Sequence, residues 1–272
     1  MGKGSIANMA LYALMCMLVC GCSAHNIADG KEFYVPPDYE YTEIKTSSFT
    51  VAAWIKTANK NYSEKGSGTL KIYIEGDGNA FNSFGYATSD PTPKGTFMRN
   101  IAFGDNHQNV IYMARPCQYA NKPPCGKKYW SSARFSKEII NSMAEAIISA
   151  KAGKNIPITL IGYSGGAQAA GLMAVLHPHL KINRIITISG NLDHSAWTKL
   201  HKVPPLKESL DLKDYRDKFL QISSVNYAGG KDRIVPPKLI QDFAGKDRTV
   251  IVPEAGHASY PPQIIQEIRE MD

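Results

Sequence analysis

The strongest chemical signal in this sequence is a serine set among glycines, at residues 162–166 (GYSGG). The segment follows the apolar run 158–161 directly and precedes a small, apolar stretch from Ala167 that is typical of a buried helix. A G-x-S-x-G pattern between a strand and a helix predicts a sharp turn that exposes the serine hydroxyl, because glycines let the backbone segments approach closely. We therefore predict that Ser164 is a nucleophile. A plain turn from strand to helix is the alternative.

A serine hydroxyl is a weak nucleophile near neutral pH, so this chemistry needs a general base, normally a histidine oriented by a carboxylate. The chain has seven histidines. His177 and His179 come at the far end of the helix that follows the serine, away from the reactive edge. His257 follows the late apolar run 249–252, within a turn. The sequence favours His257 as the base, with a solvated loop histidine as the alternative.

Two aspartates are candidates for the carboxylate that orients the histidine. Asp232 follows a predicted strand that ends near Tyr227, so its carboxylate could accept from the Nδ1–H of His257. Asp193 follows the preceding predicted strand and is the competitor. We favour Asp232, and for either aspartate a surface position in a turn is the structural alternative.

The acyl-transfer chemistry also needs N–H groups that stabilise a developing oxyanion. The Gly165 N–H lies at the start of the predicted helix, where the helix dipole favours negative charge. The predicted strand 70–74 runs into the segment EGDG, and we assign the second donor to the Asp77 backbone, with Gly78 as the alternative. A tight turn without catalytic meaning would also explain this segment.

The loop of residues 115–134 follows the next predicted strand and should overhang the same edge of the sheet. Its aromatic side chains include Tyr119 and Trp130, which either form a wall of the substrate pocket or pack the loop onto the core. Tyr163, beside the serine, is a further candidate for the pocket.

Short apolar runs alternate with helix-like stretches along the chain, which predicts an α/β fold with a mostly parallel sheet and helices on both faces. A stretch of 136–151 has apolar pairs every four residues, with Ser136 as a possible cap and Gly153 as a stop. The isoleucines at 264, 265 and 268 give the last helix its inner face. The strand candidates are residues 50–55, 70–74, 110–114, 158–161, 182–189, 224–227 and 249–252.

The first residues have the pattern of an export signal: Lys3, a mostly apolar stretch over 6–19, then small residues. The boundary around Cys22 resembles a bacterial lipobox, which implies a lipid on Cys22 and, because serine follows it, an outer-membrane destination. An ordinary cleaved signal is the alternative. We predict a signal peptide over 1–21, a tether leading into the domain over 22–47, and one domain over 48–272.

Two cysteines, Cys117 and Cys125, remain in the predicted domain once those of the signal and the lipid site are set aside. They are eight positions apart in a loop rich in proline and glycine, and an exported protein meets an oxidising compartment. We therefore expect a disulfide between them.

The charge pattern argues against nucleic acid as a partner. The formal net charge is +7, but the basic residues are scattered and form no run of five or more. The pair His177 and His179 has no cluster of other ligand residues beside it, so we predict no metal site.

Taken in order, these segments resemble the α/β-hydrolase superfamily, and more narrowly a set of exported or lipid-anchored bacterial hydrolases. The familiar His-Gly dipeptide of the oxyanion loop is replaced here by Glu75-Gly76. The resemblance implies the α/β-hydrolase fold, a Ser-Asp-His triad and no cofactor. The matching elements are residues 74–78, 115–119, 134–136, the serine turn, 230–232, 235–236 and 256–257.

From these residues we expect a serine hydrolase that cleaves a small-molecule carboxylic ester, or a related acyl bond, through an acyl-enzyme. An exported peptidase or thioesterase of the same mechanism is the nearest alternative. A lipid-anchored binding module that kept the fold without activity is a third possibility. The sequence carries no signal for an oligomeric state.

Overall fold

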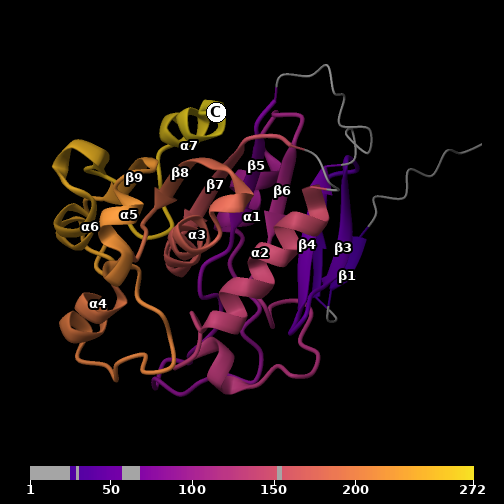
Figure 1. Cartoon of the computed structure of the whole chain (residues 1–272), viewed down its shortest axis with the longest axis horizontal. Helices are drawn as coiled ribbons and strands as arrows, with labels where there is room; N and C mark the ends of the chain where they lie inside the picture. The colour runs from indigo at the N-terminus through magenta and orange to yellow at the C-terminus, as the bar shows by residue number, and fades with distance from the viewer. Residues whose placement is uncertain (1–24, 29–30, 57–67, 152–154) are drawn as a thin grey trace, which may run out of the picture.

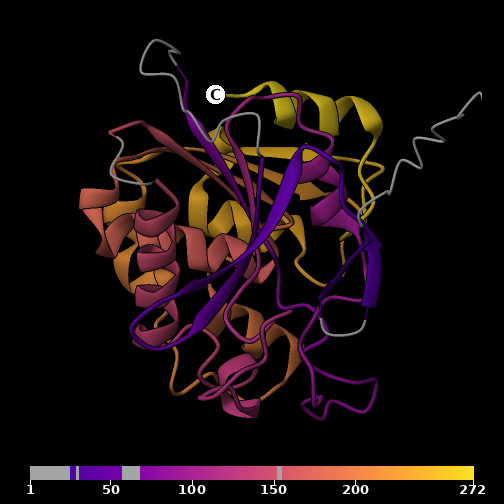
Figure 2. The ribbon, with the colours of Figure 1, turned by 90° about the vertical axis from the view of Figure 1, so that its right-hand side faces the viewer.

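The computed structural model describes residues 25–28, 31–56, 68–151 and 155–272. Its main feature is an eight-stranded sheet with strand order β10-β9-β8-β7-β5-β6-β4-β3 (Figures 1 and 2). All seven predicted strands are present. The strands are β3 Tyr39–Lys45, β4 Thr50–Lys56, β5 Leu70–Ile74, β6 Val110–Met113, β7 Ile158–Tyr163, β8 Ile182–Ile188, β9 Ser223–Gly229 and β10 Thr249–Val252.

The sheet is mostly parallel, as predicted. β6, β5, β7, β8, β9 and β10 pair in parallel, whereas β4 is antiparallel to both β3 and β6. The carboxyl ends of the parallel strands therefore meet at one edge, where the loops that follow them can bring distant residues together.

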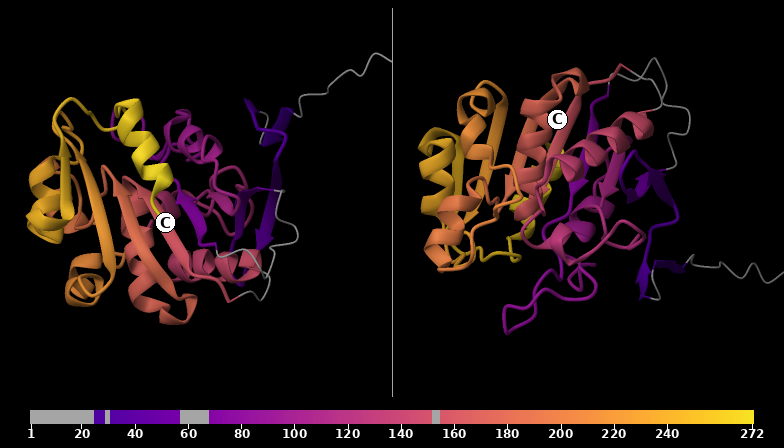
Figure 3. Two further views of the ribbon diagram at one scale, coloured as in Figure 1. Left: turned by 90° about the horizontal axis from the view of Figure 1, so that it is seen from above. Right: turned by 60° about the horizontal axis from the view of Figure 1, so that its bottom comes forward.

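Helices cover both faces of the sheet (Figure 3, left). One face packs against α2 Lys137–Lys151, α3 Gly165–Leu176, α5 Arg216–Phe219 and α6 Pro237–Ala244. The other face packs against α1 Phe97–Phe103 and α7 Pro262–Glu270. α4 His194–His201 lies beyond the carboxyl end of β8.

Strand alternation explains why β5 is buried over its whole length. Leu70, Ile72 and Ile74 join the core under α2 and α3, while Tyr73 joins the core under α1 and α7. A strand covered on both faces has apolar side chains on both, so its sequence is a continuous apolar run rather than an alternating pattern.

Part of the segment expected to be tether and domain entry, residues 22–47, belongs to the sheet. β3, which was not among the predicted strands, pairs with β4 over seven residues and forms one edge of the sheet. Tyr39 is buried, and its hydroxyl donates to the Ala102 carbonyl at 2.9 Å. A separate hairpin of β1 His25–Ala28 and β2 Lys31–Tyr34 precedes it. The predicted signal peptide and the lipid site at Cys22 lie outside the described residues and stay predictions.

The predicted ends of α2 and the predicted disulfide have different outcomes. α2 begins after Ser136, but the Ser136 hydroxyl is buried without a hydrogen-bond partner among the described residues, so this side chain does not cap the helix. Gly153, the predicted stop, lies outside the described residues. Cys117 and Cys125 form the expected disulfide.

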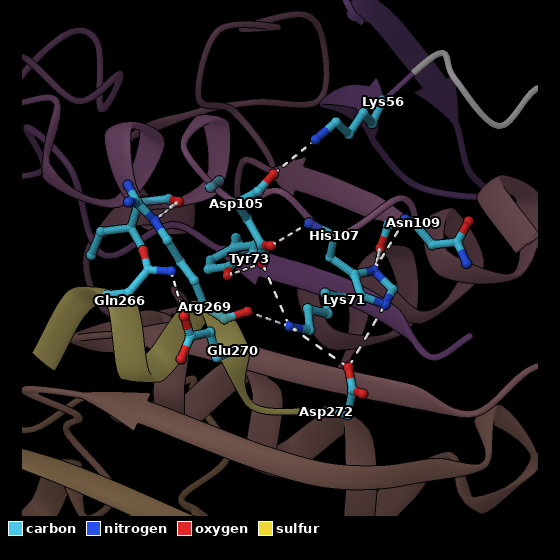
Figure 4. A network of polar contacts seen from close by, with 12 residues as sticks. Lys56, Lys71, Tyr73, Asp105, His107, Asn109, Gln266, Arg269, Glu270 and Asp272 are labelled. Atoms are coloured by element: carbon cyan, nitrogen blue, oxygen red, sulfur yellow. Dashed lines mark hydrogen bonds and ion pairs between the residues drawn. The ribbon is translucent and has the colours of Figure 1, made fainter. Parts of the chain in front are cut away.

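A buried polar network at the amino-terminal half of β5 joins this strand to α7 (Figure 4). The Lys71 ammonium donates to the Arg269 carbonyl and lies 3.7 Å from the Asp105 carboxylate. Tyr73 donates to the same carboxylate, and burial beside this carboxylate raises the pKa of Tyr73. The Arg269 guanidinium donates to two carbonyls at the end of α1. The network thus fastens α7 to the sheet and to α1.

No helix among residues 25–28, 31–56, 68–151 and 155–272 combines the length and the apolar character that crossing a membrane requires.

Candidate active site

The serine turn between β7 and α3 has the strained geometry that its sequence predicts. Ser164 has φ 51° and ψ −119°, in a region that residues with a side chain seldom occupy. Hydrogen bonds hold it there: its N–H donates to the Ile188 carbonyl, and its carbonyl accepts from the Asn191 N–H, both at 3.0 Å. The turn therefore presents the Ser164 hydroxyl at the carboxyl edge of the sheet.

The glycines on either side of the turn are required by close backbone contacts. A Cβ at Gly162 would lie 2.6 Å from the Ala167 Cα, and a Cβ at Gly166 would lie 2.5 Å from the Ile74 carbonyl oxygen. Contacts this short would displace β7, α3 or β5. The serine turn thus depends on these two glycines for close packing.

His257 lies in the turn after β10, and its imidazole reaches the serine. The Nε2 atom is 3.1 Å from the Ser164 Oγ, which is within hydrogen-bond distance. The Tyr163 ring packs against the imidazole with ring centroids 5.2 Å apart. The two residues are brought together although 93 positions separate them in the chain.

Asp232 lies in the turn after β9 and contacts the other side of the imidazole. Its Oδ2 is 2.8 Å from the His257 Nδ1, and its Oδ1 accepts from the N–H groups of Ile234 and Val235. The carboxylate is fully buried. Burial alone would raise the pKa of Asp232, but the hydrogen bond and charge of His257, with the two N–H groups, outweigh it and lower this pKa. Asp232 is therefore held as a carboxylate.

Asp193, the competing aspartate, has a different partner. Its side chain accepts from the Ala196 N–H at 2.7 Å and caps the start of α4. This is the usual function of an aspartate at a helix N-terminus, and it explains why the residue sits in a turn after a strand.

The loop after β5 lies against the serine turn. A Cβ at Gly76 would lie 3.3 Å from the Ser164 Cβ, and the Asp77 carboxylate occupies the space beside the Gly165 Cα. Within the described part of the chain, the N–H groups of Asp77 and Gly165 have no protein acceptor. Gly78, the alternative donor, has φ 65°, and a Cβ there would collide with the Pro91 carbonyl.

Two buried arginines hold the Asp77 side chain. Arg115 pairs with one carboxylate oxygen and Arg134 with the other, and Arg115 also donates to the Arg134 carbonyl. Burial would raise the pKa of Asp77, but the two guanidinium groups outweigh it and lower this pKa. The loop is thus fixed by charge as well as by packing.

Glu75, which replaces the histidine of the familiar dipeptide, is a buried carboxyl group behind the same loop. It accepts from the Tyr112 hydroxyl and from the Gly76 N–H. Burial raises the pKa of Glu75, and these hydrogen bonds together with the nearby Arg99 charge oppose that rise.

A cavity of about 380 Å³ opens in front of the serine. Its lining includes Tyr163, which is one of the predicted pocket residues, and also Trp197 and Ile234, where the Trp197 indole donates to the Ile234 carbonyl. The full lining is Glu75, Asp77, Gly78, Asn79, Pro93, Lys94, Gly95, Phe97, Met98, Tyr163, Ser164, Asn191, Trp197, Ile234, Val235, His257 and Ala258.

The structure corrects two of the predicted pocket residues. Tyr119 and Trp130 do not line this cavity, because both are buried in the loop that carries them. The Tyr119 hydroxyl accepts from Arg99, and the Trp130 indole donates to the Thr88 carbonyl. These aromatics pack the loop onto the core, which is the second of the two alternatives that the sequence left open.

The sequence did not identify Phe97 and Trp197 as cavity residues. Both belong to short helices whose approach to the serine depends on the fold of long connections. The sequence offered one signal for Trp197, which is an aromatic residue shortly after the end of a predicted strand. This signal does not tell whether the side chain lines a cavity or packs in the core.

Comparison with known proteins supports the architecture. No family model matches the chain, and no curated protein sequence matches it. Among solved structures, an esterase of Pyrococcus furiosus is similar over 88% of this chain and 94% of its own, with a TM-score of 0.59 and 15% identity.

Two bacterial structures are similar to a comparable extent. An alpha/beta fold family hydrolase of Bacillus anthracis covers 85% of this chain and 97% of its own, with a TM-score of 0.52 and 11% identity. A carboxylesterase of Bacillus subtilis covers 86% and 91%, with a TM-score of 0.52 and 14% identity. Together with the sheet order and the helices on both faces, these similarities show that the chain has the α/β-hydrolase fold.

Proposed function

We propose that this protein is a serine hydrolase that cleaves a carboxylic ester through an acyl-enzyme. The observation that carries the proposal is the continuous chain of hydrogen bonds from the Asp232 carboxylate through His257 to the Ser164 hydroxyl, at 2.8 and 3.1 Å. The hydroxyl faces a cavity whose size suits a small molecule. The esterases and hydrolases among the structural neighbours are consistent with this chemistry.

In the first half of the reaction, His257 Nε2 accepts the Ser164 proton as Oγ attacks the ester carbonyl carbon. The carbonyl oxygen becomes an oxyanion, which the N–H groups of Gly165 and Asp77 stabilise. When the tetrahedral intermediate collapses, the bond to the alcohol oxygen breaks, and the imidazolium returns its proton to that oxygen. An acyl-Ser164 ester remains.

In the second half, His257 takes a proton from water, and the hydroxide oxygen attacks the acyl carbon. Collapse breaks the bond to Ser164 Oγ, which recovers the proton and releases a carboxylic acid. Asp232 stays ionised throughout, because its lowered pKa favours the carboxylate that stabilises the imidazolium in both halves.

The lining of the cavity favours an acyl or alcohol group of modest size and apolar character. Its apolar lining residues are Phe97, Met98, Trp197, Ile234 and Val235. A volume of about 380 Å³ is near the lower end of the range for small-molecule sites. We therefore expect short and medium nitrophenyl esters to be better substrates than long ones.

A fluorophosphonate probe tests the proposal, because it phosphonylates a serine that a histidine has activated. We expect the purified protein to be labelled at Ser164, as mapped by peptide mass spectrometry, and S164A to remain unlabelled. A panel of nitrophenyl esters and aminoacyl amides would then distinguish an esterase from a peptidase. A folded protein that neither reacts with the probe nor hydrolyses any ester would support the binding-module alternative and refute this proposal.

A further inference from the structure

A side chain outside the cavity fixes the orientation of the peptide unit between Gly76 and Asp77. Its carbonyl oxygen accepts from the Gln118 side-chain amide at 2.9 Å. A trans peptide is planar, with its C=O and N–H pointing in opposite directions. A partner that fixes the Gly76 carbonyl therefore also fixes the direction of the Asp77 N–H.

Gln118 lies away from the cavity in front of Ser164. Asp77 lines that cavity, whereas Gln118 is buried and does not line it, and both residues line a second, smaller cavity. The Gly76 carbonyl points toward the buried Gln118, so the Asp77 N–H points away from Gln118.

The Gln118 amide is itself held in one orientation. Its Oε1 accepts from the Arg115 N–H at 3.0 Å, so its Nε2 is the atom left to donate to Gly76. A Cβ at Gly78 would come within 2.7 Å of that Nε2. The loop therefore needs glycine at position 78 for Gln118 to reach the peptide.

Backbone strain surrounds this glutamine. The residues on either side, Cys117 and Tyr119, have φ 75° and 61°, in the left-handed region that favours glycine. Cys117 is tied by its disulfide to Cys125, and the Tyr119 hydroxyl is bonded to Arg99. Strain of this kind persists where surrounding contacts enforce it, and it is concentrated at functional sites.

From these contacts we infer that Gln118 is a positioning residue for the oxyanion site, acting through the Gly76–Asp77 peptide. The inference rests on the proposed function. Gln118 does not touch the substrate. It holds the Asp77 N–H on the oxyanion in advance, so that no reorientation is needed in the transition state.

The test is the variant Q118M, which keeps the approximate volume of the side chain and removes its amide. We expect kcat for a nitrophenyl ester to fall at least about tenfold, toward the hundredfold loss typical of a lost oxyanion donor, with KM within about twofold. The inhibition constant of a trifluoromethyl ketone, which forms a tetrahedral oxyanion on the serine, should rise by a similar factor. Q118E adds a second variant, since it keeps the acceptor for Arg115 and lacks the donor for Gly76.

A matched control is N226L, in β9. Asn226 is also fully buried and also donates from its amide to a backbone carbonyl, that of Arg248, at 3.0 Å. It contributes nothing to the cavity lining. We expect N226L to lower the unfolding midpoint but to leave kcat and the inhibition constant within about twofold of the parent.

The outcomes separate this inference from the proposed function. If the parent protein hydrolyses esters and Q118M and Q118E keep kcat and the inhibition constant, Gln118 is not a positioning residue. The same conclusion follows if N226L loses as much kcat as Q118M, because the effect is then one of general stability. If the parent itself reacts with neither ester nor probe, the proposed function has failed first. Should Q118M not fold, Q118E alone decides.

Discussion

Two buried polar networks lie at opposite ends of β5, and they differ in what they leave unpaired. At the amino-terminal half, Lys71 and Tyr73 meet Asp105, and the donors and acceptors satisfy one another. After the carboxyl end, Asp77 is held by two arginines and lines the cavity, and its N–H has no protein acceptor in the described part of the chain. One network closes on itself and fastens α7. The other is rigid and open toward the serine.

Buried charges stabilise the fold at the Lys71 network, whereas at Asp77 they hold a loop of the proposed active site. Burying an ionised group is costly unless partners compensate for the loss of water. At the Lys71 network the partners belong to the protein. At the carboxyl edge the protein supplies two guanidinium groups for the Asp77 carboxylate, and among the described residues the Asp77 N–H has no acceptor. The proposed reaction would use this N–H in a low-dielectric environment, where its interaction with an oxyanion is strong.

The largest expected effect is at the serine beside the open network, in D232N. An asparagine can still accept from the Ile234 and Val235 N–H groups, so the loop should keep its form. Its amide would donate to His257 Nδ1, which places the imidazole proton on Nε2, where it cannot accept from Ser164. We expect kcat to fall roughly ten-thousandfold with an unchanged circular dichroism spectrum. A loss of less than about tenfold would argue against Asp232 as the orienting carboxylate.

The next largest effect is expected in D77N, which removes the negative charge between two buried arginines. We expect the free energy of unfolding to fall by about 3 kcal/mol at pH 7, because breaking a buried pair leaves charge uncompensated. Activity should fall as well, because the proposed reaction uses the Asp77 N–H and the lost charge pairing no longer holds the loop that carries it. Urea unfolding and ester kinetics measure the two effects.

The pH dependence of D77N sharpens this prediction. The folded-state pKa of Asp77 is lowered, so its contribution is complete above the unfolded pKa of about 3.9 and is lost as pH falls through the folded value. The stability difference between the parent and D77N should therefore shrink below about pH 4. D242N is the control, because the exposed Lys238 pair should contribute less than about 0.5 kcal/mol. A difference that stays constant down to pH 3 would contradict the assigned charge pairing.

The smallest effect is expected at the closed end, in K71M. Asp105 would keep its bonds to Tyr73 and to the His107 N–H, while the Arg269 carbonyl would lose its donor. We expect a loss of about 1–2 kcal/mol in the free energy of unfolding, with kcat and KM within about twofold of the parent. A tenfold loss of kcat would show that the two ends of β5 are coupled and that the Lys71 network serves more than stability.

Burial and turn geometry could be predicted from the sequence where the residue types themselves indicate them. The apolar runs of β5 and β7 are buried on both faces, so composition alone identifies them. The turn at Ser164 needs glycine on both sides, and the sequence shows these glycines directly. The meeting of Ser164 with His257 and Asp232 was predictable because each follows a strand and parallel strands share an edge.

The remainder depends on partners that the sequence does not specify. β3 was missed because exposed charged residues lie on both of its faces. Glu40 shares a face with the buried Ile44, and Glu43 and Lys45 share the other face with Tyr39, so the apolar pattern is obscured. Whether Tyr119 faces a cavity or the core is decided by its left-handed backbone and by Arg99, which lies 20 positions away. The link from Gln118 to Gly76 spans 42 positions and has no local signature.

The glycines of the serine turn also limit how this sequence can change over generations. Residues 162 and 166 lie against backbone atoms of neighbouring elements, so even one added methyl group must move a strand or a helix. At Gly126, which does not line the cavity, a methyl group would meet open space. We expect descendants of this chain to vary at residue 126 and to keep glycine at 162 and 166 for as long as the hydroxyl between them is needed.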